Sequence, residues 1–164
     1  MQEVLMDKVV VNMGVGADPD EMKKAVQIIK LITGKKPVQT ICQARIPDWG
    51  LRPGIPIGLK VTLRGNDAIE FLKKSIQAKA GKISSKSFDK EGNFGFGVRE
   101  YIDLPGAKYD PKLGIKGFDV IVALRKRGFR VKKRRIMPAI VGSKQRVKKE
   151  EAIKFAESLG IQVE

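Results

Sequence analysis

Histidine is absent from this 164-residue sequence, and cysteine occurs only once, as Cys42. Imidazole most often carries general acid–base catalysis near neutral pH and is a common ligand of zinc and haem, so its absence excludes most familiar enzyme classes. A single cysteine forms neither a disulfide within the chain nor a Cys-x-x-Cys metal or redox site. We therefore expect a protein without enzymatic activity, cofactor or metal, in a reducing, cytoplasmic compartment.

Long apolar runs are missing as well. The longest, Val120 to Leu124, has five residues, whereas a membrane-spanning helix needs about twenty. The amino-terminal residues MQEVLMDK include Glu3 and Asp7 and contain no apolar core of signal-peptide length. The sequence predicts a protein that neither spans a membrane nor is exported.

Acidic residues are scarce, with 18 Asp and Glu against 33 Lys and Arg, which gives a net charge of +15. Residues 125–149 contain twelve basic residues and no acidic one. Gly128, Pro138 and Gly142 interrupt this segment, so helical acid–base pairs cannot neutralise it, and we expect RNA phosphates to supply the countercharge. The candidate phosphate contacts are Arg125, Lys126, Arg127, Arg130, Lys132, Lys133, Arg134 and Arg135.

Local patterns predict alternating strands and helices. Asp18, Pro19 and Glu21 are typical of an N-cap, a first helical position and a capping-box partner, and Gly34 is typical of a helix end. The predicted stripe of this helix is Met22, Ala25, Val26, Ile29 and Ile32, and that of a second helix capped by Asn66 is Ile69, Leu72 and Ile76. The predicted strands are 8–16, one ending at Cys42, 59–65, 94–104 and 118–124, and a last helix covers 148–159.

The resulting order, βαββαββ before the last helix, favours an α+β fold. We predict a split βαβ (ferredoxin/RRM-like) sandwich, with a largely antiparallel sheet and helices packed on one face. No repeat or low-complexity linker marks a second domain, so a single domain is expected over residues 1–164.

A loop at 44–58 contains three prolines and three glycines, which excludes regular structure throughout it. Its Trp49, the only tryptophan, is flanked by Arg45 and Arg52, a combination suited to base stacking and phosphate contact. The alternative is that Trp49 folds back onto the domain.

Two further motifs have competing interpretations. Gly14-x-Gly16 resembles part of a dinucleotide-binding loop, but Pro19 replaces the third glycine and acidic residues crowd the helix start, which argues against bound pyrophosphate. Phe94 and Phe96 alternate along one strand face, as in RNA-stacking strands or an ordinary core. With Trp49, they support an alternative function as a sequence-tolerant single-stranded RNA-binding module.

Five motifs, in order along the chain, resemble the family of large-subunit ribosomal protein number five. They are NMGVG at 12–16, TGKKPV at 33–38, PIGLKVTLRG at 56–65, KSFDKEGNFGFGV at 86–98 and GFDV at 117–120. The later GFRVKKRR and SKQRVKKEEAIKFAESLG resemble the archaeal and eukaryotic branch, so that the resemblance covers essentially the whole chain.

The resemblance implies a structural role in translation, not catalysis. Its implied partners are 5S rRNA in the central protuberance, 23S rRNA, P-site tRNA, other central-protuberance proteins and a small-subunit protein at an inter-subunit bridge. By position, the implied 5S rRNA contacts are Asn12, Gly14, Gly16, Lys35, Lys36, Lys60, Thr62 and Arg64. The loop with Arg45, Trp49 and Arg52 is implied to reach tRNA and the small subunit.

Overall fold

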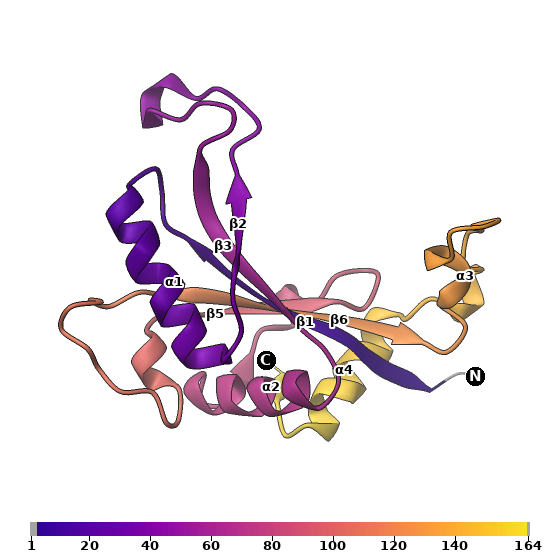
Figure 1. The fold of residues 1–164 in the computed structure, drawn as a ribbon. Coiled ribbons are helices and arrows are strands. Elements are labelled where there is room, and N and C mark those ends of the chain that lie inside the picture. Colours follow the sequence, from indigo (N-terminus) through magenta and orange to yellow (C-terminus); the bar gives the residue numbers. More distant parts are fainter. Residues whose placement is uncertain (1–2, 164) are drawn as a thin grey trace. The chain divides into compact units, whose positions relative to one another are not determined.

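A five-stranded antiparallel sheet is the main element of the computed structural model, which describes residues 3–163 (Figure 1). Its strands are β1 (Val4–Gly14), β2 (Val38–Ile41), β3 (Pro56–Leu63), β5 (Phe94–Val98) and β6 (Phe118–Lys126), in the order β2-β3-β1-β6-β5. The helices are α1 (Pro19–Thr33), α2 (Asn66–Ala78), α3 (Arg130–Lys133) and α4 (Lys149–Ser158). This arrangement is consistent with a split βαβ sandwich and confirms the predicted fold class.

The chain divides into two compact units. The first unit contains the chain up to Val9, residues 64–96 and the part from Ile121 onward, and the second contains residues 10–63 and 97–120. The boundaries therefore fall within β1 and β6 and within β5. The single domain expected over 1–164 stays a prediction.

Helix α1 shows how local sequence determines an element of the second unit. The Asp18 carboxylate accepts a hydrogen bond from the Asp20 amide at 3.0 Å, Pro19 occupies the first turn, and Gly34 ends the helix with a φ of 67°. The buried face contains Met22, Ala25, Ile28 and Ile29, so Ile28 takes the place that the predicted stripe gave to Val26. Both predicted helix ends are confirmed.

Strand β3 also follows its sequence pattern. Leu59, Val61 and Leu63 are buried, whereas Lys60 and Thr62 are exposed, as the alternation predicted. Gly58 lies where a Cβ atom would come within 2.9 Å of both the Met13 carbonyl oxygen and the Thr40 Oγ1 atom. The absence of a side chain there allows β3 to pack closely between β2 and β1.

Several predicted boundaries are wrong. Strand β1 begins at Val4 instead of Lys8, because pairing at the centre of the sheet continues through the polar Asp7 to the apolar residues before it. Strand β5 ends at Val98, and Tyr101–Asp103 form a 3₁₀ turn in which the fully buried Tyr101 hydroxyl accepts a hydrogen bond from the Asp110 amide at 3.3 Å. The predicted strand to residue 104 is therefore two separate elements.

Other corrections concern the first unit. Gly65, with a φ of 63°, is the N-cap of α2, so Asn66 is the first helical residue. Ile69 is exposed, and Phe71 packs inward in its place. A parallel pair of two-residue strands, β4 (Lys82–Ile83) and β7 (Gln162–Val163), was missed because two residues show no periodicity. The last helix was predicted within one residue at each end.

Among the described residues, no helix has the length and apolar character required to cross a membrane.

Candidate nucleic-acid interface

Three predicted RNA-binding cations meet on one carboxylate of the first unit. Lys133 Nζ donates a hydrogen bond to Asp7 Oδ2 at 2.6 Å, while Arg125 Nε lies 3.2 Å and Arg64 Nη1 lies 3.5 Å from Asp7 Oδ1. Asp7 belongs to β1, Arg64 follows β3, Arg125 belongs to β6 and Lys133 to α3. These four residues form the Asp7 cluster.

The Asp7 cluster carries an excess of positive charge. Burial raises the pKa of Asp7, but the hydrogen bond from Lys133 and the charges of Lys133, Arg64 and Arg125 outweigh it and hold that pKa below its usual value. Asp7 is thus ionised at neutral pH and neutralises one of three cations. Its side chain is 9% exposed, whereas those of Arg64, Arg125 and Lys133 are 57%, 40% and 46% exposed. The cations can therefore meet a further anion from solvent.

Two neighbours on the basic segment differ in exposure. Lys126, which was expected to contact phosphate, is 4% exposed, and its Nζ donates to Glu151 Oε1 at 2.7 Å. The hydrogen bonds from Lys126 and from the Lys148 backbone lower the pKa of Glu151. Arg127 Nη2 lies 3.1 Å from Glu3 Oε2, with both side chains more than half exposed. Lys126 is thus a core residue, and Arg127 remains at the surface.

Countercharge for the basic segment therefore comes partly from the protein itself. Glu3, Asp7 and Glu151 lie outside residues 125–149, yet each pairs with a residue inside it. The expectation that phosphates supply the countercharge was incomplete. One sequence signal could have revealed the role of Asp7. It is the one acidic residue of an otherwise largely apolar strand, in which three valines follow Lys8.

Helix α3 presents further cations beside an aromatic ring. Lys132 Nζ and Lys133 Nζ lie 5.5 and 5.3 Å from the centroid of the Phe129 ring, within the range of cation–π attraction. Arg130, Lys132, Arg134 and Arg135, all predicted phosphate contacts, are exposed. An open groove of ≈ 810 Å³ borders this helix. Its apolar lining includes Ile121, Ala123, Phe129, Pro138 and Ile140, and its basic lining includes Lys8, Arg125, Lys132, Lys133 and Arg146.

In the second unit, residues 42–55 extend the β2–β3 hairpin. The Cys42 amide donates to the Ile55 carbonyl at 2.8 Å, and Ile46 and Leu51 exchange two backbone hydrogen bonds of 3.0 Å each. A 3₁₀ turn at Pro47–Trp49 closes the tip, which lies beyond β2 and β3 in Figure 1. The predicted loop 44–58 thus has its own backbone hydrogen bonds, and β3 begins inside it.

Trp49 is 72% exposed at this hairpin tip, so the alternative in which it folds back onto the domain is wrong. Arg45 and Arg52 are exposed, and neither forms an ion pair with any other residue between 3 and 163. The Cys42 thiol is buried and donates to the Ala44 carbonyl at 2.9 Å. The tip therefore combines an exposed ring with two guanidinium groups that form no ion pair within the described part of the chain.

Most other predicted 5S rRNA contacts also lie in the second unit. Lys35, Lys36, Lys60 and Thr62 are exposed or partly exposed, and so are Asn12, Gly14 and Gly16 near the end of β1. The Gly16 amide donates to the Ile57 carbonyl at 3.0 Å, so this amide is already used within the protein. A φ of 95° explains the glycine there. Arg64 instead belongs to the first unit and the Asp7 cluster.

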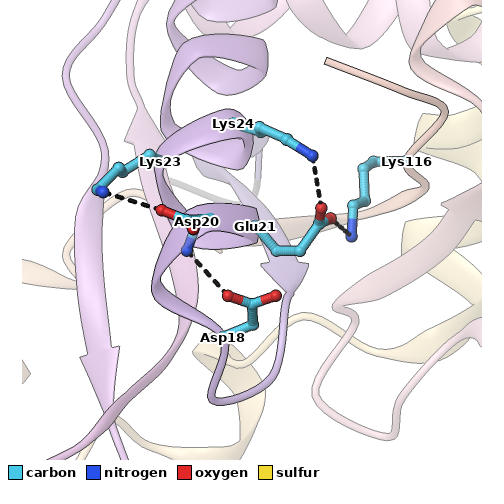
Figure 2. A network of polar contacts seen from close by, with 6 residues as sticks. All are labelled: Asp18, Asp20, Glu21, Lys23, Lys24 and Lys116. Carbon is cyan, nitrogen blue, oxygen red and sulfur yellow. Dashed lines mark hydrogen bonds and ion pairs between the residues drawn. The ribbon is translucent and has the colours of Figure 1, made fainter. Parts of the chain in front are cut away.

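Carboxylates occupy the start of α1 and are already paired (Figure 2). Lys23 Nζ donates to Asp20 at 2.9 Å, and Glu21 accepts hydrogen bonds from both Lys24 and Lys116 at 2.8 and 2.6 Å. The bonds from Lys116 and Lys24 lower the pKa of Glu21 to about 2. Glu21 thus binds two lysines instead of acting as the predicted capping-box partner. The negative charge at this helix start agrees with the rejection of a nucleotide phosphate site.

Phe94 and Phe96 are core residues. They are 2% and 8% exposed, and the Phe94 ring stacks on Phe88 with 5.0 Å between the centroids. Rings in this position cannot stack on nucleic-acid bases without opening the core. The ordinary-core interpretation of this strand is confirmed. No group of three or more His, Cys, Asp or Glu side chains within residues 3–163 is placed to hold a metal ion.

Comparison with known proteins agrees with this arrangement. The family model described as ribosomal protein L5 matches residues 1–52, and the model of the ribosomal L5P family C-terminus matches residues 56–155. Large ribosomal subunit protein uL5 of Thermoplasma volcanium is 47% identical over 158 residues, which cover 96% of this chain and 93% of that protein. The proteins of the same name from Nanoarchaeum equitans and Archaeoglobus fulgidus are 47% and 46% identical, covering 99% and 100% of this chain and 97% and 92% of their own lengths. The chain therefore belongs to the ribosomal protein L5 family.

Proposed function

We propose that this chain is a cytoplasmic structural component of the large ribosomal subunit that binds 5S rRNA and helps to attach it in the central protuberance, in contact with 23S rRNA. Its relatives carry the name of a large-subunit ribosomal protein, and the family is one of structural, non-enzymatic proteins. The binding of 5S rRNA follows from the resemblance of the motifs at 12–16, 33–38 and 56–65.

The observation that carries an RNA-binding function is the Asp7 cluster. Three cations from separate elements converge on one carboxylate, which gives the cluster a net charge of +2 and leaves most of the Arg64 side chain exposed. Folded RNA presents phosphates at fixed spacings, so a fixed group of cations can recognise its backbone without reading bases. We assign Arg64, Arg125, Arg127, Arg130, Lys132, Lys133, Arg134 and Arg135 to rRNA phosphates and leave out the buried Lys126.

The second unit supplies the other proposed contacts. Asn12, Gly14, Gly16, Lys35, Lys36, Lys60 and Thr62 are the proposed 5S rRNA contacts there. The hairpin tip, with Arg45, Trp49 and Arg52, is proposed to contact P-site tRNA and a small-subunit protein. Its exposed indole and two guanidinium groups are suited to stacking and phosphate binding. The alternative single-stranded RNA module is not supported, because the burial of Phe94 and Phe96 removes two of its three stacking rings.

The test is a comparison of 5S rRNA with an unstructured RNA of equal length, using the full-length protein in moderate salt. We expect clearly tighter binding to 5S rRNA. Cationic side chains at fixed positions match the fixed phosphate positions of a folded RNA, whereas an unstructured RNA must lose conformational entropy to match them. Equal affinity for both RNAs would remove the proposal.

A further inference from the structure

The position of Asp7 is costly for a carboxylate. Its side chain is 9% exposed on β1, the strand that also contains the fully buried Val9. Removing an ionised carboxylate from water is unfavourable unless charges and hydrogen bonds replace its hydration. Lys133, Arg125 and Arg64 provide that replacement, and all three belong to elements that are distant from Asp7 in sequence. Asp7 thus links these segments to one point on the sheet.

We infer that Asp7 is a positioning residue that holds Arg64, Arg125 and Lys133 in their RNA-binding arrangement before RNA arrives. This inference rests on the proposed function. Long cationic side chains lose conformational entropy when they become fixed on RNA, and this loss weakens binding. Asp7 fixes them in the free protein, so that less entropy remains to be lost.

The competing interpretation is that Asp7 hinders binding. An acidic group beside phosphates repels them, and it occupies cations that RNA could use. In that case RNA must displace Asp7, and removing its charge should strengthen binding. The two interpretations predict opposite signs for the same substitution.

Glu3 provides a matched control within the same unit. It also pairs with an arginine of the basic segment, Arg127, at 3.1 Å, but its side chain is 59% exposed and that of Arg127 is 63% exposed. Exposed pairs of this kind restrict their side chains little. Asp7→Asn and Glu3→Gln each raise the net charge by one, and general electrostatics therefore predicts equally strengthened binding for both.

The experiment measures the Kd for 5S rRNA of the full-length wild-type protein, Asp7→Asn and Glu3→Gln at several salt concentrations. We expect Asp7→Asn to bind about five- to tenfold more weakly than wild type, despite its extra positive charge. Without the Asp7 carboxylate, the side chains of Arg64, Arg125 and Lys133 are mobile in the free protein and lose more conformational entropy when RNA binds. Glu3→Gln should bind equally or slightly more tightly. Binding by Asp7→Asn that equals or exceeds that of Glu3→Gln overturns the inference.

Amide hydrogen exchange of the free proteins gives a second readout that does not depend on RNA. In Asp7→Asn, the amides of α3 and its flanking residues 128–135 should exchange faster, with those of α2 and α4 unchanged, and Glu3→Gln should match wild type. If Asp7→Asn unfolds, Lys133→Met is the second variant, because it removes the lysine partner of the 2.6 Å contact with Asp7. The same increase in amide exchange at residues 128–135 is expected. Unchanged exchange in 128–135 contradicts the inference. Failure of wild type to bind 5S rRNA instead contradicts the proposed function.

Discussion

Cations of the basic segment, in the first unit, and cations of the hairpin tip, in the second unit, are held in different ways. In the first unit, Arg125, Lys126 and Lys133 each pair with a carboxylate from another part of the chain. At the hairpin tip of the second unit, Arg45 and Arg52 form no ion pair with any residue that the structure describes, and backbone hydrogen bonds between the two arms order the tip.

Under the proposed function, this difference corresponds to two modes of RNA contact. Cations fixed by carboxylates form a preorganised surface that suits an RNA of constant shape, such as a folded rRNA. Exposed side chains on a hydrogen-bonded hairpin can adjust, which suits a partner that arrives and leaves, such as a tRNA. Substitutions of paired residues in the basic segment should therefore change protein stability or RNA binding. Substitutions at the hairpin tip should change RNA binding and leave stability unaltered.

The largest effect is expected for Lys126→Ala. This change removes a side chain that is 4% exposed and leaves Glu151 without its 2.7 Å partner, so that the free energy of unfolding should fall by about 2 to 3 kcal/mol. Urea denaturation measures it, with Lys154→Ala, an exposed residue of α4, as the control. Because Lys126 is buried, the salt dependence of RNA binding should not change. A loss of stability below about 0.5 kcal/mol would contradict its assignment to the core.

Gly58→Ala tests the base of the hairpin. Its new Cβ would lie 2.9 Å from the Met13 carbonyl oxygen and from Thr40 Oγ1, and relieving that overlap should cost about 1 to 3 kcal/mol of stability. Gly14→Ala is the matched control, because no atom lies within 4 Å of its Cβ position. Thermal unfolding should show a lower Tm for Gly58→Ala than for Gly14→Ala, and equal Tm values would refute the close packing of β3.

Acid should weaken the pairing at the start of α1. The folded-state pKa of Glu21 is about 2, below its ordinary value of 4.5, so this carboxylate contributes stability above pH 4.5 and loses that contribution as the pH falls toward 2. Glu21→Gln should thus reduce the difference in unfolding free energy between pH 5 and pH 2. Lys116→Met, which removes the 2.6 Å partner, should act in the same direction. An unchanged pH dependence in both variants would contradict this pairing.

The smallest change in stability is expected for the double substitution Arg45→Ala and Arg52→Ala. Both side chains are exposed, so the free energy of unfolding should stay within about 0.5 kcal/mol of wild type. Binding of tRNA to ribosomes that carry the variant should weaken, because two phosphate-binding groups are lost. Destabilisation together with normal tRNA binding would reverse the proposed contrast between the basic segment and the hairpin tip.

Local signals in the sequence predicted part of this structure. The ends of α1 follow from Asp18, Pro19 and Gly34, and the exposed face of β3 follows from strict alternation, since neighbouring residues alone determine these features. The five-residue strand β5 was correctly interpreted as core, although its length was overestimated.

Features that depend on distant residues could not be predicted. The hydrogen bond between Asp7 and Lys133 joins positions 126 residues apart, and the pairing of β4 with β7 joins the middle of the chain to its end. Charge counting therefore identified the basic segment, but it could not separate the buried Lys126 from the partly exposed Arg125 and the exposed Lys133.

The most direct test of the central claim, that the Asp7 cluster binds RNA phosphates, is the salt dependence of 5S rRNA binding by wild type and Lys133→Met. Each phosphate contact that is lost lowers the slope of log K against log[salt] by about one. We predict a slope lower by about one for Lys133→Met. An identical slope for the two proteins would contradict the account.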